Sequence, residues 1–278
     1  MIRWPLPLAA VWVSFPVVGV LLSISFTPIA PYDYWWHLAM GRMTAATGTV
    51  PSSNLFLYTL PVDAPFLNQP WLGQLALYEV FRTWGHWGPY LLRNLIAGGT
   101  WIGLAAAAVD RSPDPRVAGG VLLAVGGLSG IVFGVRTRMF ALPLYVATLA
   151  VTVAVADGRW SARWLWSLVP VTAVWSNLHG SFALAPALVA AIGGSRVVEE
   201  AIAGELEADL VRTWGGPGAA VALAGMANPH GWRAYEYVVE LTFFSAIPST
   251  VSEWQPPDPY QFFGAASLVL MVLALAIA

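Results

Sequence analysis

Long apolar segments, separated by shorter polar connections, make up most of this chain. A helix needs about 20 largely apolar residues to cross the hydrocarbon core of a bilayer. The pattern predicts about eight such helices, over residues 6–29, 89–109, 117–135, 139–156, 164–175, 182–194, 217–227 and 262–278. The fifth, sixth and seventh segments are short, so they need neighbouring residues to cross, or they are tilted or re-entrant. The sequence therefore predicts an all-α, polytopic transmembrane bundle that forms one domain over residues 1–278.

Apolar runs also lie at both ends of the chain. The first run follows Arg3 and is too long for the apolar part of a signal peptide, and no clear cleavage site follows it. We therefore expect a retained helix. The last run reaches the final residue, so we expect either a truncated form or the ordered part of a larger protein.

The longest polar connection, residues 31–88, has a helical pattern of its own. Its apolar positions predict one amphipathic helix over residues 35–47 and a second over residues 71–84. The stretch 48–70 between them is rich in proline and is predicted to be a loop. We expect both helices to lie along the membrane surface.

The remaining connections alternate between the two membrane faces if the N-terminus is cytoplasmic. The inner connections are then residues 110–116, 157–163 and 195–216, the last being a charged amphipathic linker. The outer connections are residues 31–88, 136–138, 176–181 and 228–261. Arginine is only weakly enriched in the inner connections, which is a weak positive-inside signal. We therefore attribute the outer arginines to functional or structural contacts.

The composition supports the membrane assignment and excludes several kinds of site. Charged residues make up only 10% of the chain, whereas a soluble domain has about 25%. Cysteine is absent, which excludes disulfides and thiolate metal sites. The net charge of −2 argues against a nucleic-acid partner, which requires a basic surface. The 15 tryptophans fit a protein whose indoles anchor at membrane interfaces.

Asp33 and His37 are the first candidates for a functional role. Four residues separate them, which places both on one face of a helix. A carboxylate at the membrane interface is costly without a partner, a proton or an ion. The alternatives are a simple N-cap for Asp33 and a hydrogen-bonded structural role for His37.

Two connections combine turn residues with histidine. The stretch 175–181 contains Asn177 and His179, and it forms either a turn closed by Gly180 or one wall of a site. The stretch 228–233 contains His230 and Arg233. The guanidinium of Arg233 suits a phosphate or carboxylate, and a lipid headgroup contact is the alternative.

Two further segments are candidates at the outer face. Arg136 and Arg138 flank a tight turn, where they are either interfacial anchors or a fork for a phosphate group. Glu253 precedes a stiff Pro-Pro pair. The alternative is that this segment is merely a rigid loop. The alternating topology places all of these candidates, and all four histidines, on the outer face. This segregation predicts one site at the outer membrane surface.

The segment 33–42, with the sequence DYWWHLAMGR, resembles the first outer loop of GT-C superfamily glycosyltransferases, including oligosaccharyltransferase catalytic subunits. The continuation Gly48-Thr49-Val50-Pro51 with Asn54 and Tyr58 is also similar. More broadly, most of the chain resembles a bacterial group of GT-C-like membrane proteins. The resemblance implies a helical bundle whose first outer loop carries two interfacial helices. It also implies a bacterial inner (cytoplasmic) membrane location with an outward-facing active side.

The implied reaction is transfer of a sugar from a polyprenyl-phosphate donor to an acceptor. Asp33 matches the catalytic aspartate of loop one, as a base toward the acceptor or as a ligand of a divalent ion such as Mg or Mn. His37 belongs to the same catalytic segment. Arg136, Arg138 or Arg233 would hold the departing phosphate. The second acidic pair of the family is missing, with Glu253 and Asp258 the nearest substitutes, which puts a metal bound by Asp33 and Glu253 in doubt.

Two other functions are compatible with the sequence. One is a non-catalytic GT-C-like subunit that packs with other membrane subunits, which the missing acidic pair and the short chain favour. The other is a binder or transporter of lipid phosphates. The expected partners are therefore a polyprenyl-phosphate lipid, membrane lipids and other membrane subunits.

Overall fold

A computed structural model describes residues 6–30, 33–56, 58–112, 114–128 and 134–244 of the chain. These residues form helices and a single isolated bridge between Ser53 and Pro65, with no strand. The all-α prediction is therefore confirmed for the part of the chain that is described. The predicted eighth span, residues 262–278, lies outside it.

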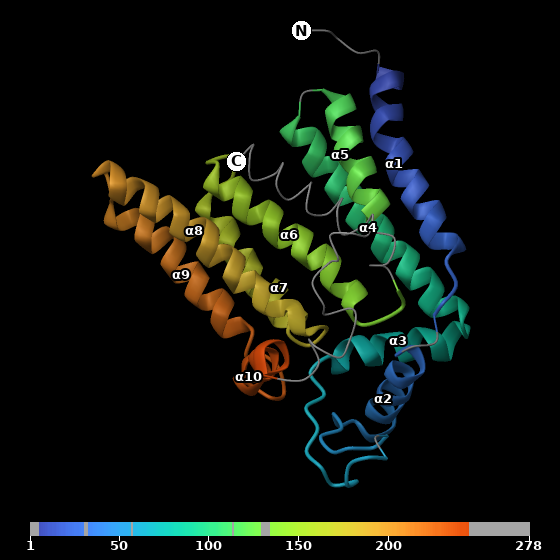
Figure 1. Ribbon diagram of the computed structural model, residues 1–278. Coiled ribbons are helices and arrows are strands. Elements are labelled where there is room, and N and C mark those ends of the chain that lie inside the picture. Colours follow the sequence, from blue (N-terminus) through green and yellow to red (C-terminus); the bar gives the residue numbers. More distant parts are fainter. Residues whose placement is uncertain (1–5, 31–32, 57, 113, 129–133, 245–278) are drawn as a thin grey trace.

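The main bundle consists of seven helices that run up and down beside one another (Figure 1). They are α1 (Leu6–Phe26), α4 (Trp87–Arg111), α5 (Pro115–Leu128), α6 (Arg138–Ala156), α7 (Leu168–Trp175), α8 (Leu184–Ala203) and α9 (Ala208–Ala224). Short 3₁₀ turns, Ala162–Ser167 and Gly180–Ala183, lead into α7 and α8. The helices α2 (Tyr34–Thr47), α3 (Trp71–Trp84) and α10 (Arg233–Val239) gather at one end of the bundle (Figure 1). A π-helical turn, Glu240–Phe244, continues α10.

Three helical segments among the described residues are long and apolar enough to cross a membrane. They are Trp87–Arg111, Arg138–Ala156 and Gly180–Ala203. Two shorter apolar helical segments, Ala10–Phe26 and Pro115–Gly127, accompany them. Large apolar side chains such as Phe15 and Leu95 remain exposed on these helices, as expected of side chains that face lipid. The chain therefore has the character of a membrane protein.

The two helices predicted within the first long connection are present, with nearly the expected bounds. Gly48 ends α2 in the left-handed conformation at φ 66°, which glycine adopts without steric cost. Helices α2 and α3 cross at Gly41, where an added Cβ would lie 2.2 Å from the Gln74 carbonyl oxygen. The two helices can approach this closely because glycine has no side chain.

The predicted linker 195–216 is not a separate element. Helix α8 continues to Ala203 and α9 begins at Ala208, so only residues 204–207 connect them. The charged residues extend both helices because their side chains point outward, and Arg196 pairs with Glu199 one turn later on α8 at 2.7 Å. Gly204, at φ 74°, ends α8. The two helices therefore extend beyond the predicted membrane segments 182–194 and 217–227 into the charged stretch.

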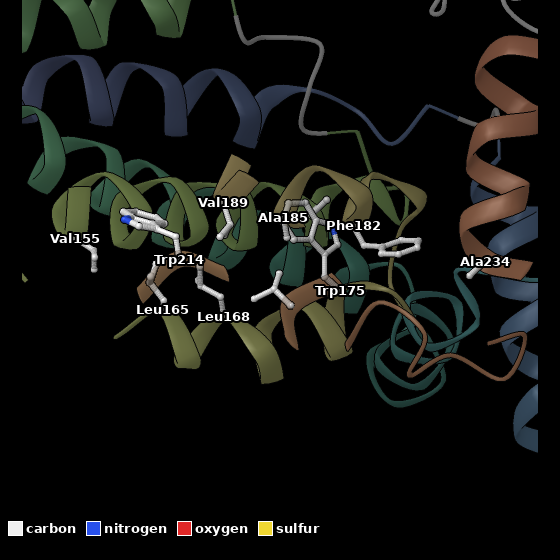
Figure 2. Packing of buried hydrophobic residues seen from close by; sticks show 11 residues of the cluster. Val155, Leu165, Leu168, Trp175, Phe182, Ala185, Val189, Trp214 and Ala234 are labelled. Atoms are coloured by element: carbon white, nitrogen blue, oxygen red, sulfur yellow. The ribbon is translucent and has the colours of Figure 1, made fainter. Parts of the chain in front are cut away.

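The largest apolar core lies between α6, α7, α8 and α9. Figure 2 shows Trp175, Phe182, Val189 and Trp214 in this cluster, and all four are buried. The ring of Trp214 lies directly over Gly193, where an added Cβ would be 2.5 Å from it. A second cluster joins α1, α4 and α5 around Trp101.

A buried arginine attaches the end of α1 to α4. Arg93, fully buried on α4, donates hydrogen bonds to the carbonyl oxygens of Ile24 at 2.8 Å and Thr27 at 3.0 Å. The last carbonyl groups of a helix have no partner within that helix and carry partial negative charge, so they stabilise the buried guanidinium. The Tyr90 hydroxyl donates to the Ser25 carbonyl beside them. These bonds determine where the chain leaves α1 on its way to Asp33.

The crossing of α2 and α3 generates a stability prediction. Gly41→Ala should destabilise the protein by about 1–3 kcal/mol, because its new methyl group overlaps the backbone of α3. Gly98→Ala on α4 is the matched control, because no atom lies within 4 Å of its added Cβ. Thermal unfolding of the detergent-solubilised protein measures both. Equal midpoints for the two variants would show that α2 and α3 do not pack as described.

Candidate functional site

The candidate residues gather at the end of the bundle where α2, α3 and α10 lie. The chain reaches this end after α1, before α6, between α7 and α8, and after α9 (Figure 1). The opposite end has an ordinary ion-pair network, in which Asp157 pairs with Arg111 at 2.7 Å and with Arg159 at 3.3 Å. The segments that carry the described candidates therefore lie at one end of the bundle.

Asp33 occupies the N-cap position of α2 without acting as a cap. Its backbone lies at φ −84° and ψ −2°, and its side chain makes no capping hydrogen bond. The carboxylate instead forms an ion pair with Arg136, with 3.6 Å between Oδ2 and Nε. The Asp33 side chain is 56% exposed, whereas that of Arg136 is only 16% exposed. The carboxylate therefore remains accessible to another molecule while one side of it faces a guanidinium.

His37 lies one helical turn after Asp33 and is buried. Burial above all, together with the positive charge of Arg136 and the neighbouring His179, lowers its pKa to about 4. His37 Nδ1 has no hydrogen-bond partner among the described residues. At neutral pH the ring is therefore uncharged, and its Nδ1 is a buried polar atom without a partner among the described residues.

His179 lies in the connection between α7 and α8 and belongs to the same cluster. Its pKa is lowered to about 4 by burial and by the positive charge of Arg138. The backbone N–H of Ser181 donates to His179 Nδ1 at 3.1 Å, so the neutral ring carries its proton on Nε2. Two neutral imidazoles thus lie beside two permanently charged guanidinium groups.

The turn interpretation proposed that Gly180 closes a helix, and the structure differs on this point. Helix α7 ends at Trp175, and Gly180 begins the 3₁₀ turn that leads into α8. His179 itself, in an extended conformation at φ −164°, is the cap of that turn through its Nδ1. The ring therefore has a structural role as well as its place in the polar cluster.

Asn177 and Asn228 connect three chain segments and do not form an open wall. The Asn177 side chain accepts from Trp71 Nε1 at 2.6 Å and donates to the carbonyl oxygen of Ala227 at 2.6 Å. The Asn228 side chain donates to the Ser176 carbonyl at 2.8 Å and to the Gln69 carbonyl at 3.2 Å. The polar groups of both amides are used within the protein, so we assign them a structural role.

Arg233 and His230 line a cavity of about 370 Å³ beside α10. This cavity also contains Glu236 and Glu240, two carboxylates that the sequence interpretation missed. Their spacing of three and seven residues from Arg233 on one helix was the signal that could have identified them. Gln69 was missed as well, and no sequence pattern marks it. Glu253, the remaining candidate, lies outside the described residues.

Metal binding was predicted for Asp33 with Glu253. Within the ranges that the structure describes, no three His, Asp or Glu side chains gather as metal ligands would. Around Asp33 the nearest charged partner is the cation Arg136.

The amide connections generate a second stability prediction. Asn177→Ala should destabilise the protein by about 1–3 kcal/mol, because the indole N–H of Trp71 and the Ala227 carbonyl lose their partner. Trp71→Phe removes only one of these bonds and should cost less. Chemical or thermal unfolding in detergent measures both. A larger loss for Trp71→Phe would show that Asn177 does not hold the segments together.

The two histidines generate a pH prediction. Their pKa values of about 4 in the folded protein lie below the ordinary value of 6.5, so the unfolded chain binds protons more readily. The stability they contribute is complete above pH 6.5 and is lost as the pH falls toward 4. The unfolding midpoint should therefore drop over this range, and less steeply in His37→Gln. A variant with the same pH dependence as the native protein would contradict the assignment.

Comparison with protein-family models, with curated proteins and with solved structures finds no significant match to this chain. The resemblance of residues 33–58 to GT-C glycosyltransferases therefore stays a prediction.

Proposed function

We propose that this protein is a GT-C-type membrane glycosyltransferase with about eight spans. It would move a sugar from a polyprenyl-phosphate donor to an acceptor at the outer face of a bacterial inner membrane. The observation that carries the proposal is the cluster of Asp33, His37, Arg136 and His179 at one end of the bundle, with Arg138 next to it. It combines an accessible carboxylate, uncharged imidazoles and guanidinium groups.

Arg136 and Arg138 suit the donor phosphate. When the bond between the sugar and the phosphate breaks, negative charge grows on the phosphate oxygens, and fixed positive charge stabilises it. Arg138 is the first residue of α6, whose N-terminus adds the positive end of the helix dipole. Partial removal of Arg136 from water strengthens its interaction with an anion. Because the two histidines are neutral at pH 7, the arginines supply the positive charge of the cluster.

Asp33 suits the acceptor side of the reaction. Its carboxylate would take the proton from an acceptor hydroxyl while that oxygen attacks the anomeric carbon. The new glycosidic bond forms as the bond from the anomeric carbon to the phosphate oxygen breaks. Polyprenyl phosphate then leaves with the bonding electron pair and one additional negative charge. The ion pair with Arg136 places the base beside the group that would receive this anion.

A divalent ion does not fit the described residues around Asp33. A metal there would lie close to the positive charge of Arg136, which already neutralises the carboxylate. Among the described members of the cluster, Asp33 supplies the carboxylate alone.

The same ion pair favours a second candidate, a non-catalytic subunit of a larger membrane complex. Asp33 and Arg136 join the start of α2 to the start of α6, which is useful for structure alone. In that case the cluster would hold the loop helices in place for a protein partner. A measurement of glycosyltransferase activity distinguishes the two candidate functions.

The direct test is turnover of a polyprenyl-phosphate sugar by the purified protein, followed by release of polyprenyl phosphate. Asp33→Asn should lower the rate by about 100-fold or more, the usual effect of removing a catalytic base. Asp63→Asn is the matched control, because Asp63 is an exposed carboxylate in the same outer connection. Equal rates for the native protein and Asp33→Asn would remove Asp33 from the mechanism. A native protein without turnover on any polyprenyl-phosphate sugar would favour the subunit.

A further inference from the structure

The cavity beside α10 lies between that helix and the first long connection. Residues from both segments line it, and the chain positions of these segments are far apart. Its principal side chains are Phe66, His230, Arg233, Glu236, Tyr237 and Glu240. A volume of about 370 Å³ lies within the range of small-molecule sites, which is roughly 300–1,000 Å³.

Positive and negative groups line this cavity together. Burial lowers the pKa of His230, and the positive charge of Arg233 lowers it as well. Burial raises the pKa of Tyr237, and the negative charge of Glu240 raises it as well. The charge of Arg233 therefore affects the His230 ring, and the charge of Glu240 affects the Tyr237 hydroxyl. The helix widens into a π turn at Glu240, a feature often found at functional sites.

Phe66 is held in place at the opposite wall. Its backbone N–H donates to the Ser52 carbonyl at 2.9 Å, next to the bridge between Ser53 and Pro65. Its ring packs edge-on against Trp36, with 5.8 Å between the ring centres. The half-buried ring thus offers a fixed apolar surface to the cavity.

The cavity is connected to the polar cluster through aromatic contacts. Trp36 packs against Phe66 on one side and against His37 on the other, with 5.4 Å between the centres of the last two rings. Phe66 and Trp36 therefore link the wall of the cavity to His37, and Asp33 is one helical turn from His37.

The lining selects the chemistry of the ligand. Carboxylates only accept hydrogen bonds from hydroxyl groups at neutral pH, whereas a guanidinium only donates them. An anion would meet Glu236 and Glu240, and a cation would meet Arg233. A neutral, hydroxyl-rich molecule satisfies all three, and the C–H face of a sugar ring packs against an aromatic ring such as Phe66.

We propose that this cavity binds the acceptor as a neutral saccharide, which revises the earlier assignment of Arg233 to the donor phosphate. The inference rests on the proposed glycosyltransferase function and names the substrate class of its acceptor side. Glu236 and Glu240 accept hydrogen bonds from the sugar hydroxyls, and Arg233 donates to a ring or hydroxyl oxygen. They are binding residues and take no part in bond breaking.

The test is binding of a panel of saccharide probes to the detergent-solubilised full chain. The probes are the methyl glycosides of glucose, galactose, mannose and N-acetylglucosamine, and saturation-transfer NMR reports their contact with the protein. At least one glycoside should bind the native chain. Glu236→Gln and Glu240→Gln should each weaken its binding about 10-fold. Glu205→Gln, an exposed carboxylate at the opposite end of the bundle, should leave binding unchanged.

Inorganic phosphate is the contrasting probe. The absence of glycoside binding to the native chain, or an equal loss in Glu205→Gln, would overturn the inference. Phosphate binding that Arg233→Gln abolishes, without any glycoside signal, would also overturn it and return Arg233 to a phosphate site. Asp33→Asn separates this inference from the proposed function, because it should stop sugar transfer and leave glycoside binding intact. Glycoside binding by a native chain without transferase activity would sink the proposed function and leave the saccharide site standing.

Discussion

The hydrogen bonds of two asparagine side chains hold together the end of the bundle that carries the candidate site. Asn177 joins Trp71 of α3 to the Ala227 carbonyl, and Asn228 joins the Gln69 and Ser176 carbonyls. Three connections that are distant in sequence thereby share one buried polar centre. In such a centre an unmade hydrogen bond is expensive, so the three connections adopt one arrangement. The histidines and arginines of the candidate site are carried by these connections or lie directly against them.

Burial and neighbouring charges give the residues of the proposed site different roles. His37 and His179 are kept neutral because burial and the neighbouring guanidinium groups oppose a further positive charge. Arg136 and Arg138 stay charged, and Asp33 remains accessible although it is paired. The arrangement would offer a growing phosphate anion a fixed positive environment and leave a carboxylate free to face an acceptor. The cavity beside α10 extends this picture, since its mixed charges favour a neutral hydroxylated molecule over an ion.

Much of the fold could be predicted because apolar length and helical periodicity are local properties. The helices in the first long connection begin and end within one residue of their predicted bounds, since Gly48 and Gly85 end them. The extent of α8 and α9 within residues 195–216 was not predicted, because charged side chains on the outside of a continuing helix look the same in sequence as those of a connecting one. Asp33 similarly has the sequence of an N-cap, and only its neighbour Arg136, which is distant in sequence, distinguishes the two roles.

The sequence by itself determined that this chain is an all-helical membrane protein and that its unusual polar residues share one end of the bundle. Both conclusions follow from hydrophobic length and alternation, which need no long-range contact. Only the tertiary structure decided which polar residues meet. It turned Asn177 and Asn228 inward as connectors, placed Asp33 and His37 near Arg136 and His179 near Arg138, and separated Arg233 into a cavity with Glu236 and Glu240. These outcomes depend on contacts between segments that lie 50 residues or more apart, and residue type alone does not encode them.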